Sequence, residues 1–191
     1  MSESLTPAER KYLLKLARTS MEQAVRGQPL TSLDPSEWSN SLREEGASFV
    51  TLTLVHSGAL RGCVGALEAY QPLAFDVREH AIAAALKDYR FPPVAEHELH
   101  SIQVEISRLT QPVPLEYDSP EDLLNKLTVG RDGVLLQDGW KRATFLPQVW
   151  EKVNSKQEFL DNLCRKMGVV GDHWRRKHLQ ISLYQVEEFH E

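Results

Sequence analysis

The chain has 191 residues, with 22 lysines and arginines against 27 aspartates and glutamates, so its formal net charge is −5. Hydrophobic residues make up 41% of the chain and charged residues 26%. This composition is that of an ordinary globular protein, and it excludes collagen-like, intrinsically disordered and disulfide-scaffold chains. A chain of this length can bury a core without a metal ion or a disulfide, and we expect a single domain over residues 1–191.

Charge and cysteine content also bear on the protein's partners and compartment. Nucleic-acid-binding proteins usually present a basic surface, whereas the densest basic cluster here is one short run, residues 175–178, which we interpret as a solvated face. Residues 1–30 are polar and charged, Cys63 and Cys164 lie far apart, and no stretch approaches the ~18 apolar residues of a membrane span. We therefore expect a cytoplasmic protein with reduced thiols that binds neither nucleic acid nor membranes.

The N-terminal segment has the features of a capped helix. Thr6 stands at the N-cap, Pro7 at the first helical position and Glu9 where a capping box places its acid, while Gly27 and Pro29 end the helix. Residues at helical spacing form its apolar face: Leu13, Leu14, Ala17, Met21, Ala24 and Val25. Residues 28–46, rich in Pro, Ser and Glu, predict a connecting loop, and a loop of this length usually has a role such as covering a cleft.

A hairpin, a second helix and a further strand are expected next. Residues 49–55 and 60–67 predict two strands joined by a turn over residues 56–58. Helical spacing follows Pro72, and this helix must end near Asp88 because Phe91 precedes a proline. Residues 101–107 alternate cleanly, with three aliphatic side chains on one face: Ile102, Val104 and Ile106.

The C-terminal part of the chain continues the mixture of helices and strands. We expect a helix over residues 119–126, three short strands separated by turns at Gly133 and Gly139, a helix over residues 155–168 that starts with the pair Ser155 and Glu158, and a final strand over residues 179–183. Antiparallel hairpin signals with helices between them predict an α+β fold, a mostly antiparallel sheet flanked by helices.

The most informative segment is residues 60–65, in which Gly62 and Gly65 interrupt a strand. Glycine within a strand often marks a bulge, or a place where a ligand or another backbone comes close. In a regular strand Arg61 and Cys63 project from one face, and the guanidinium favours the thiolate that a nucleophilic cysteine needs. The other face then meets the core through Leu60, Val64 and Ala66.

The same segment has a structural interpretation. Cys63 could be a small buried hydrophobe, in which case the two glycines only permit tight packing. A bulge at Gly62 would also reverse the alternation on which the pairing of Arg61 with Cys63 depends. Both interpretations remain open at the level of sequence.

A second charged segment, residues 88–94, joins a helix end to a rigid pair of prolines. Asp88 could act as a base or could orient Arg61 or Arg90, and either arginine could bind a carboxylate or phosphate through two hydrogen bonds. The alternative is a local cap, in which Asp88 and Arg90 pair at the helix C-terminus.

The histidines give no metal-site signal. Residues 96–100 (Glu-His-Glu-Leu-His) lack the i, i+4 histidine pair of a helical zinc site, so we interpret them as surface residues. His80 lies near the inward face of the second helix, where we expect it to bond a neighbouring backbone group. We therefore expect no metal ion and no cofactor.

Several blocks of the sequence together resemble the AMMECR domain family. Residues 60–65 resemble its signature hexapeptide, with Val64 where isoleucine is typical, and residues 84–94 resemble its alanine-rich helix followed by Asp-x-Arg-Phe-Pro-Pro. Further blocks follow in order over residues 102–114, 130–134, 144–150 and 159–166. The family-matching core therefore spans residues 48–186, after an N-terminal helix and loop over residues 1–47.

The resemblance implies a two-lobed protein with a cleft beside the signature strand, and a candidate site within it. We expect an enzyme or enzyme component that acts on a small anionic or carbonyl substrate, with catalytic residues Cys63, Arg61 and Asp88 and substrate-binding residues Arg90, Gly62 and Gly65. Bacterial and archaeal members are associated with a Memo-like protein and a radical S-adenosylmethionine protein, the AmmeMemoRadiSam system. The alternative function is a non-catalytic binding or scaffold partner of those two proteins.

Overall fold

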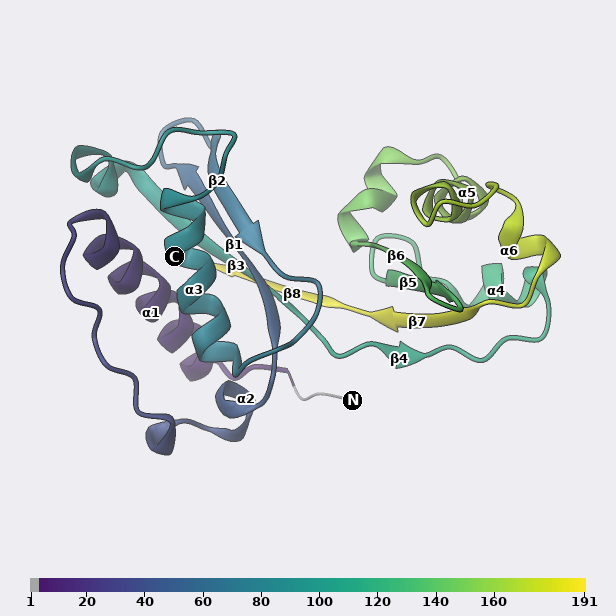
Figure 1. The fold of residues 1–191 in the computed structure, drawn as a ribbon, viewed down its shortest axis with the longest axis horizontal. Helices are drawn as coiled ribbons and strands as arrows, with labels where there is room; N and C mark the ends of the chain where they lie inside the picture. Colours follow the sequence, from purple (N-terminus) through teal and green to yellow (C-terminus); the bar gives the residue numbers. More distant parts are fainter. Residues whose placement is uncertain (1–3) are drawn as a thin grey trace. The chain divides into compact units, whose positions relative to one another are not determined.

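The structure, a computed structural model, describes residues 4–191 (Figure 1). The chain forms two compact units: the first is its N-terminal part up to Leu109 together with Glu187–Glu191, and the second is Thr110–Val186. Each unit contains helices and a four-stranded sheet with antiparallel pairing. The predicted α+β class is therefore confirmed, and the single expected domain contains two units.

The first unit places its helices against one face of its sheet, whose strand order is β2-β1-β3-β8 (Figure 1). Its elements are α1 (Pro7–Val25), the 3₁₀-helix η1 (Pro35–Glu37), α2 (Asn40–Arg43), β1 (Ala47–Leu54), β2 (Leu60–Gly65), α3 (Leu73–Leu86), the 3₁₀-helix η2 (Glu96–Ser101), β3 (Ile102–Leu109) and β8 (Val186–His190).

The N-terminal helix and its loop form as the sequence indicates, with one addition. In α1 the Thr6 hydroxyl accepts the Glu9 N–H and the Glu9 carboxylate accepts the Thr6 N–H, a complete capping box. The loop that follows is anchored, because it contains η1 and α2 and buries Trp38 and Leu42 in the core. Burying a large apolar side chain contributes roughly 1.5–3 kcal/mol, so this segment is part of the first unit's core.

Alternation along β1 gives the first sheet two different faces. Val50 and Leu52 are fully buried among the helices, so Thr51 and its alternate neighbours project from the opposite face. In β3 the three aliphatic residues predicted to share a face are buried: Ile102, Val104 and Ile106. The two-faced sheet determines on which side each residue of β2 lies.

The second unit is built on a sheet with strand order β4-β7-β5-β6. Trp150 stacks on Phe159 in its core, with ring centroids 3.6 Å apart. Its elements are β4 (Val113–Pro114), α4 (Pro120–Lys126), β5 (Gly133–Asp138), β6 (Lys141–Phe145), the 3₁₀-helix η3 (Pro147–Lys152), α5 (Lys156–Lys166), α6 (His173–Arg176) and β7 (Gln180–Tyr184).

Two expectations about strands are wrong. Only two strands, β5 and β6, form where three were predicted, because Asp132 is buried and its carboxylate accepts the Thr128 N–H, which makes the preceding segment a turn. The strand predicted to be the last is followed by β8, which lies beside β3. Few apolar residues mark β8: only Val186 and Phe189.

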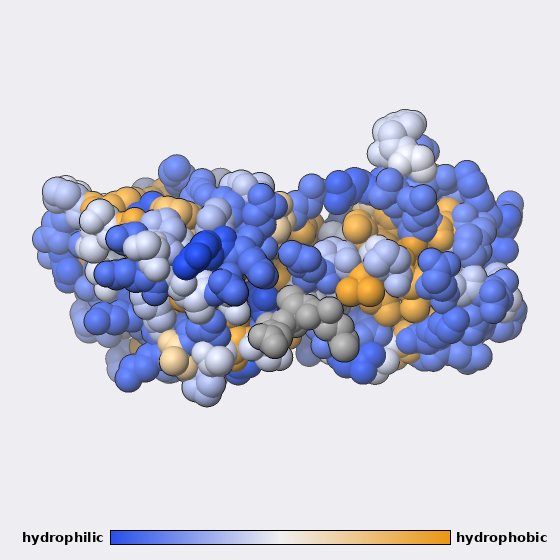
Figure 2. All heavy atoms as spheres, turned by 90° about the horizontal axis from the view of Figure 1, so that it is seen from below, coloured by the Kyte–Doolittle hydropathy of each residue, from blue (hydrophilic) through white to orange (hydrophobic). Residues whose placement is uncertain are grey.

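The surface is mostly polar with local apolar exceptions. On the face shown in Figure 2, hydrophilic side chains cover most of the surface and apolar side chains emerge in separate patches. Large apolar side chains are exposed on the segments around β2: Val55, Leu60, Leu67, Tyr70 and Tyr89. Over residues 4–191, no helix has both the length and the apolar character to cross a bilayer.

Candidate functional site

The signature strand β2 contains a β-bulge at Arg61. Gly62 lies opposite Leu52 of β1, whereas the next paired residue, Leu60, lies opposite Thr53, so Arg61 is an extra residue in the ladder. The regular alternation expected for this strand is therefore wrong at this point. Leu60 is 41% exposed instead of facing the core, while Arg61 is buried.

Cys63 lies on the sheet face away from the helices. It pairs with Thr51 of β1, whose hydroxyl donates a hydrogen bond to the Cys63 sulfur over 3.3 Å. Cys63 is half-buried, whereas Cys164 is fully buried in the second unit's core, and this burial raises the pKa of the Cys164 thiol. Glu105 of β3 lies on the other side of Thr51. Of the two thiols, Cys63 is therefore the one that a reagent can reach.

Asp88 and Arg90, just beyond the end of α3, hold the backbone of Cys63. The Asp88 carboxylate accepts the Cys63 N–H at 2.8 Å, and the Arg90 guanidinium donates to the Cys63 carbonyl at 3.2 Å. The two side chains pair through two hydrogen bonds, of 2.9 and 2.7 Å. Because β2 is an edge strand, this pair occupies a position where another strand could bind.

The electrostatics of this pair favour an orienting role for Asp88. Its hydrogen bond from the Arg90 side chain, assisted by the backbone N–H groups of Cys63 and Arg90, holds the pKa of Asp88 well below its usual range. The Asp88 carboxylate in turn raises the pKa of Arg90. Asp88 is thus ionised, and its oxygens accept hydrogen bonds from Cys63 and Arg90. In this state Asp88 positions Arg90 and is a poor proton acceptor.

Arg61 forms an ion pair with Glu98, a residue that no sequence motif indicated as part of the site. The Arg61 Nε and Nη2 groups donate to the two Glu98 carboxylate oxygens at 2.8 and 3.0 Å, and Nη1 donates to the Pro92 carbonyl at 3.0 Å. Arg61 lowers the pKa of Glu98 to about 2. The expectation that residues 96–100 lie at the surface needs correction at Glu98, whose side chain is only 25% exposed and is paired with Arg61. No local sequence pattern indicated this pairing.

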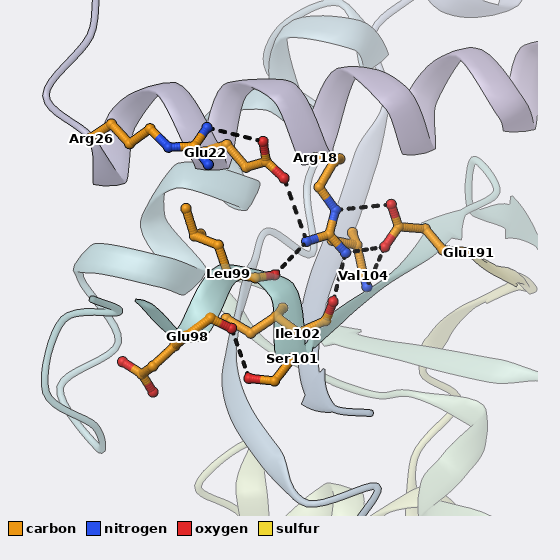
Figure 3. Close-up of polar contacts among 9 residues, drawn as sticks. All are labelled: Arg18, Glu22, Arg26, Glu98, Leu99, Ser101, Ile102, Val104 and Glu191. Carbon is orange, nitrogen blue, oxygen red and sulfur yellow. Dashed lines mark hydrogen bonds and ion pairs between the residues drawn. The ribbon is translucent and has the colours of Figure 1, made fainter. Parts of the chain in front are cut away.

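Arg18 of α1 fixes the segment that carries Glu98 (Figure 3). Its guanidinium donates to the carbonyls of Leu99 (3.2 Å) and Ile102 (2.7 Å) and pairs with the carboxylate of Glu191. The Glu98 carbonyl accepts the Ser101 hydroxyl at 2.8 Å, while its carboxylate points away from Arg18. The backbone of η2 is thus held on one side, and the Glu98 carboxylate reaches Arg61 on the other.

The two signature glycines allow close packing. A Cβ atom on Gly62 would lie 2.1 Å from the Ala84 carbonyl oxygen of α3. A Cβ atom on Gly65 would lie 2.4 Å from the Ser48 carbonyl oxygen and equally close to the Phe49 ring. Another backbone, and not open space, faces both positions, so the packing interpretation accounts for both glycines.

A second polar cluster lies between α3 and β1. His80 Nδ1 is 3.1 Å from a carboxylate oxygen of Asp76, and the Ser48 hydroxyl donates to the same oxygen at 2.6 Å. The expectation that His80 bonds a backbone group is therefore wrong, because its ring contacts the Asp76 carboxylate instead. Within residues 4–191, no group of three or more His, Cys, Asp or Glu side chains is arranged to hold a metal ion.

Comparison with known proteins identifies the family. Residues 14–189 match the family model described as AMMECR1. The chain belongs to the AMMECR1 family. Family members include a protein from Methanothermobacter thermautotrophicus that is 39% identical over 192 residues, covering 98% of this chain and 96% of its own, and a protein from Thermofilum pendens that is 38% identical over 198 residues, covering 97% and 91%.

A solved structure confirms the fold of this AMMECR1 chain. The crystal structure of the uncharacterized protein PH0010 from Pyrococcus horikoshii matches it with a TM-score of 0.72 and 33% sequence identity. The match covers 94% of this chain and 90% of that one. The resemblance found in the ordered sequence blocks is therefore confirmed over nearly the whole chain.

Proposed function

We propose that Cys63 and Arg90 form a reaction site for a small substrate with an anionic group close to a carbonyl carbon. One observation carries this proposal: Arg90, anchored by Asp88 and bonded to the Cys63 backbone, keeps 43% of its side chain exposed. Its Nη1 group makes no hydrogen bond within residues 4–191 and is free to bind an anion. A positioned arginine beside an accessible thiol is the arrangement that such a substrate requires.

Each residue of the site has a distinct role in this proposal. Arg90 binds the anionic group, and the Cys63 thiol gives its proton to solvent. The resulting thiolate attacks the carbonyl carbon, forming a C–S bond while the carbonyl π electrons move to oxygen, which takes a proton from solvent. Thr51 donates to the sulfur while it is charged, and Asp88 holds Arg90 in place. Arg61 acts through Glu98 as a positioning residue for the bulge.

We propose a cytoplasmic location for the protein, where the thiols of Cys63 and Cys164 would be kept reduced.

A second candidate function, docking of a partner protein, is supported by Tyr89. This residue lies between Asp88 and Arg90 and is 96% exposed. An exposed aromatic residue on a fixed segment is typical of residues that dominate protein interfaces. The candidate partners are the Memo-like and radical S-adenosylmethionine proteins associated with the family. Tyr89→Ala should abolish co-purification with such a partner and leave Cys63 reactivity unchanged; retained co-purification would eliminate this function.

The reaction-site proposal can be tested without a known substrate. We would alkylate the native protein with iodoacetate, which is anionic, and iodoacetamide, which is neutral, and measure both rates at Cys63 by mass spectrometry. Relative to the unfolded chain, the native protein should favour iodoacetate by up to about fivefold, since a unit charge about 4 Å away contributes about 1 kcal/mol in water. The paired Asp88 carboxylate offsets part of the Arg90 charge and so reduces this preference.

Variants separate the charge of Arg90 from that of Asp88. Arg90→Gln should remove the preference for iodoacetate, but it also leaves the Asp88 carboxylate uncompensated. The double variant Asp88→Asn/Arg90→Gln removes both charges and should bring the ratio to that of the unfolded chain. Arg175→Gln in the second unit is the matched control and should leave the ratio unchanged. An equal ratio in wild type and the double variant would refute the role of Arg90.

A further inference from the structure

A pocket of about 270 Å³ lies between α1 and the loop that follows this helix. It shares no lining residue with the Cys63 site. The loop is fixed at two points: the Trp38 indole N–H donates to the Tyr12 hydroxyl at 2.8 Å, and the side chain of Gln23 bonds both the hydroxyl and the backbone N–H of Thr31, at 2.9 and 3.1 Å. These bonds fix the loop against α1 and so define the shape of the pocket.

The interior of the pocket is apolar with hydroxyl groups. Leu16 of α1 and Leu33 of the loop are half-buried and line it together with Trp38, whose ring packs edge-on against Phe75. Ser20, also in the lining, is buried. Pockets for larger ligands span about 300–1,000 Å³, so this smaller volume suits a ligand with a compact apolar group.

Charged side chains of both signs complete the lining. Lys15 comes from α1, and Asp34 and Glu37 come from the loop; all three are exposed. Within residues 4–191, none of the three forms an ion pair, and Asp34 accepts only local hydrogen bonding from Ser36, at 2.8 Å. One cation and two anions at an apolar pocket complement a ligand that carries both an ammonium and a carboxylate.

We propose that this pocket binds a small zwitterion, an α-amino acid with an apolar side chain. The side chain of the ligand packs against Leu16 and Leu33. Its ammonium group pairs with Asp34 and Glu37, and its carboxylate pairs with Lys15. This binding function is separate from the reaction proposed at Cys63, and the long loop after α1 forms one wall of the pocket.

Three compounds with the same phenyl group test the charge requirement. L-Phenylalanine carries both charges, 2-phenylethylamine only the ammonium and 3-phenylpropionate only the carboxylate. Isothermal titration calorimetry should give the tightest binding for L-phenylalanine and up to about fivefold weaker binding for each of the others, since an exposed ion pair contributes at most about 1 kcal/mol. No binding of L-phenylalanine, or equal binding of either singly charged compound, would overturn the proposal.

Single substitutions assign each contact. Lys15→Met should weaken L-phenylalanine binding by up to about fivefold and leave 2-phenylethylamine unaffected, whereas Glu37→Gln should weaken both. Lys11→Met, on the same helix but outside the pocket, is the matched control and should change neither. Ser20→Leu fills the pocket and should abolish binding.

Amide chemical shifts of the ¹⁵N-labelled protein locate the ligand independently of any variant that fails to fold. On addition of L-phenylalanine, the shifts should move over residues 31–38. Shifts confined to other residues would refute the pocket as the site.

Discussion

The partly buried pair of Arg61 and Glu98 connects the bulge of β2 to η2, and the effect of removing it on stability can be estimated. The side chains are 10% and 25% exposed. Glu98→Gln keeps the shape of the side chain but removes its charge, so Arg61 remains buried without an anionic partner. Breaking a fully buried pair costs about 3–5 kcal/mol, and an exposed pair contributes about 0–1 kcal/mol. Since a quarter of Glu98 meets water, we expect a loss of about 2 kcal/mol.

Urea denaturation followed by circular dichroism measures this loss, and the melting temperature should fall by about 4–8 °C. Glu96→Gln is the matched control because Glu96 lies in the same 3₁₀-helix and pairs with Arg26 while 69% of its side chain is exposed. The control should change the free energy of unfolding by less than about 0.5 kcal/mol. Equal stability of the Glu98→Gln variant and wild type would refute this account of the bulge.

The same pair predicts a pH dependence. Arg61 lowers the pKa of Glu98 from 4.5 to about 2, so folding favours the ionised carboxylate. Its contribution to stability is complete above the pKa of the unfolded chain and is lost as the pH falls towards the folded value. The stability difference between wild type and Glu98→Gln should therefore shrink between about pH 5 and pH 2. A constant difference over this range would contradict the assignment.

Two further substitutions test the local geometry of β2. Gly62→Ala should lower the free energy of unfolding by about 2–3 kcal/mol, because its Cβ would lie 2.1 Å from the Ala84 carbonyl oxygen. Gly139→Ala, in open space at a positive φ of 60°, should lower it by about 1–2 kcal/mol. Urea denaturation measures both losses, and equal losses would argue against the close approach of α3. Leu60→Ala should lower the free energy of unfolding by less than about 1 kcal/mol and Leu52→Ala by about 2–5 kcal/mol, since only Leu52 is buried. A large loss of stability for Leu60→Ala would be evidence for regular alternation in β2 instead of a bulge.

The features that could be predicted from the sequence depend on short stretches of chain. The capping box of α1 joins residues only three apart, and the alternation of β3 depends on a handful of neighbouring side chains. Asp88 and Arg90 are two residues apart, so their pairing could also be foreseen. Contacts between residues so close in sequence are set by the local backbone conformation, which is why these elements form where expected.

The features that could not be predicted depend on distant partners. Glu98 lies 37 positions from Arg61, and no local pattern shows that the two meet or that β2 bulges to bring them together. The strand β8 depends likewise on β3 and on the pairing of Arg18 with Glu191, 173 positions away. The hydrogen bond from the Cys63 N–H to Asp88 could not be predicted either, because only the packing of α3 on β2 brings the two residues together.

The reactivity of Cys63 in the native protein decides whether this thiol is the nucleophile of the proposed site. The alkylation rate of each cysteine by iodoacetamide would be measured by mass spectrometry at one pH, in the native protein and in urea. We predict that native Cys63 reacts faster than the same thiol in the unfolded chain, while buried Cys164 reacts only after unfolding. Slower alkylation of Cys63 in the native protein than in urea would contradict the proposal and leave Cys63 as a packing residue.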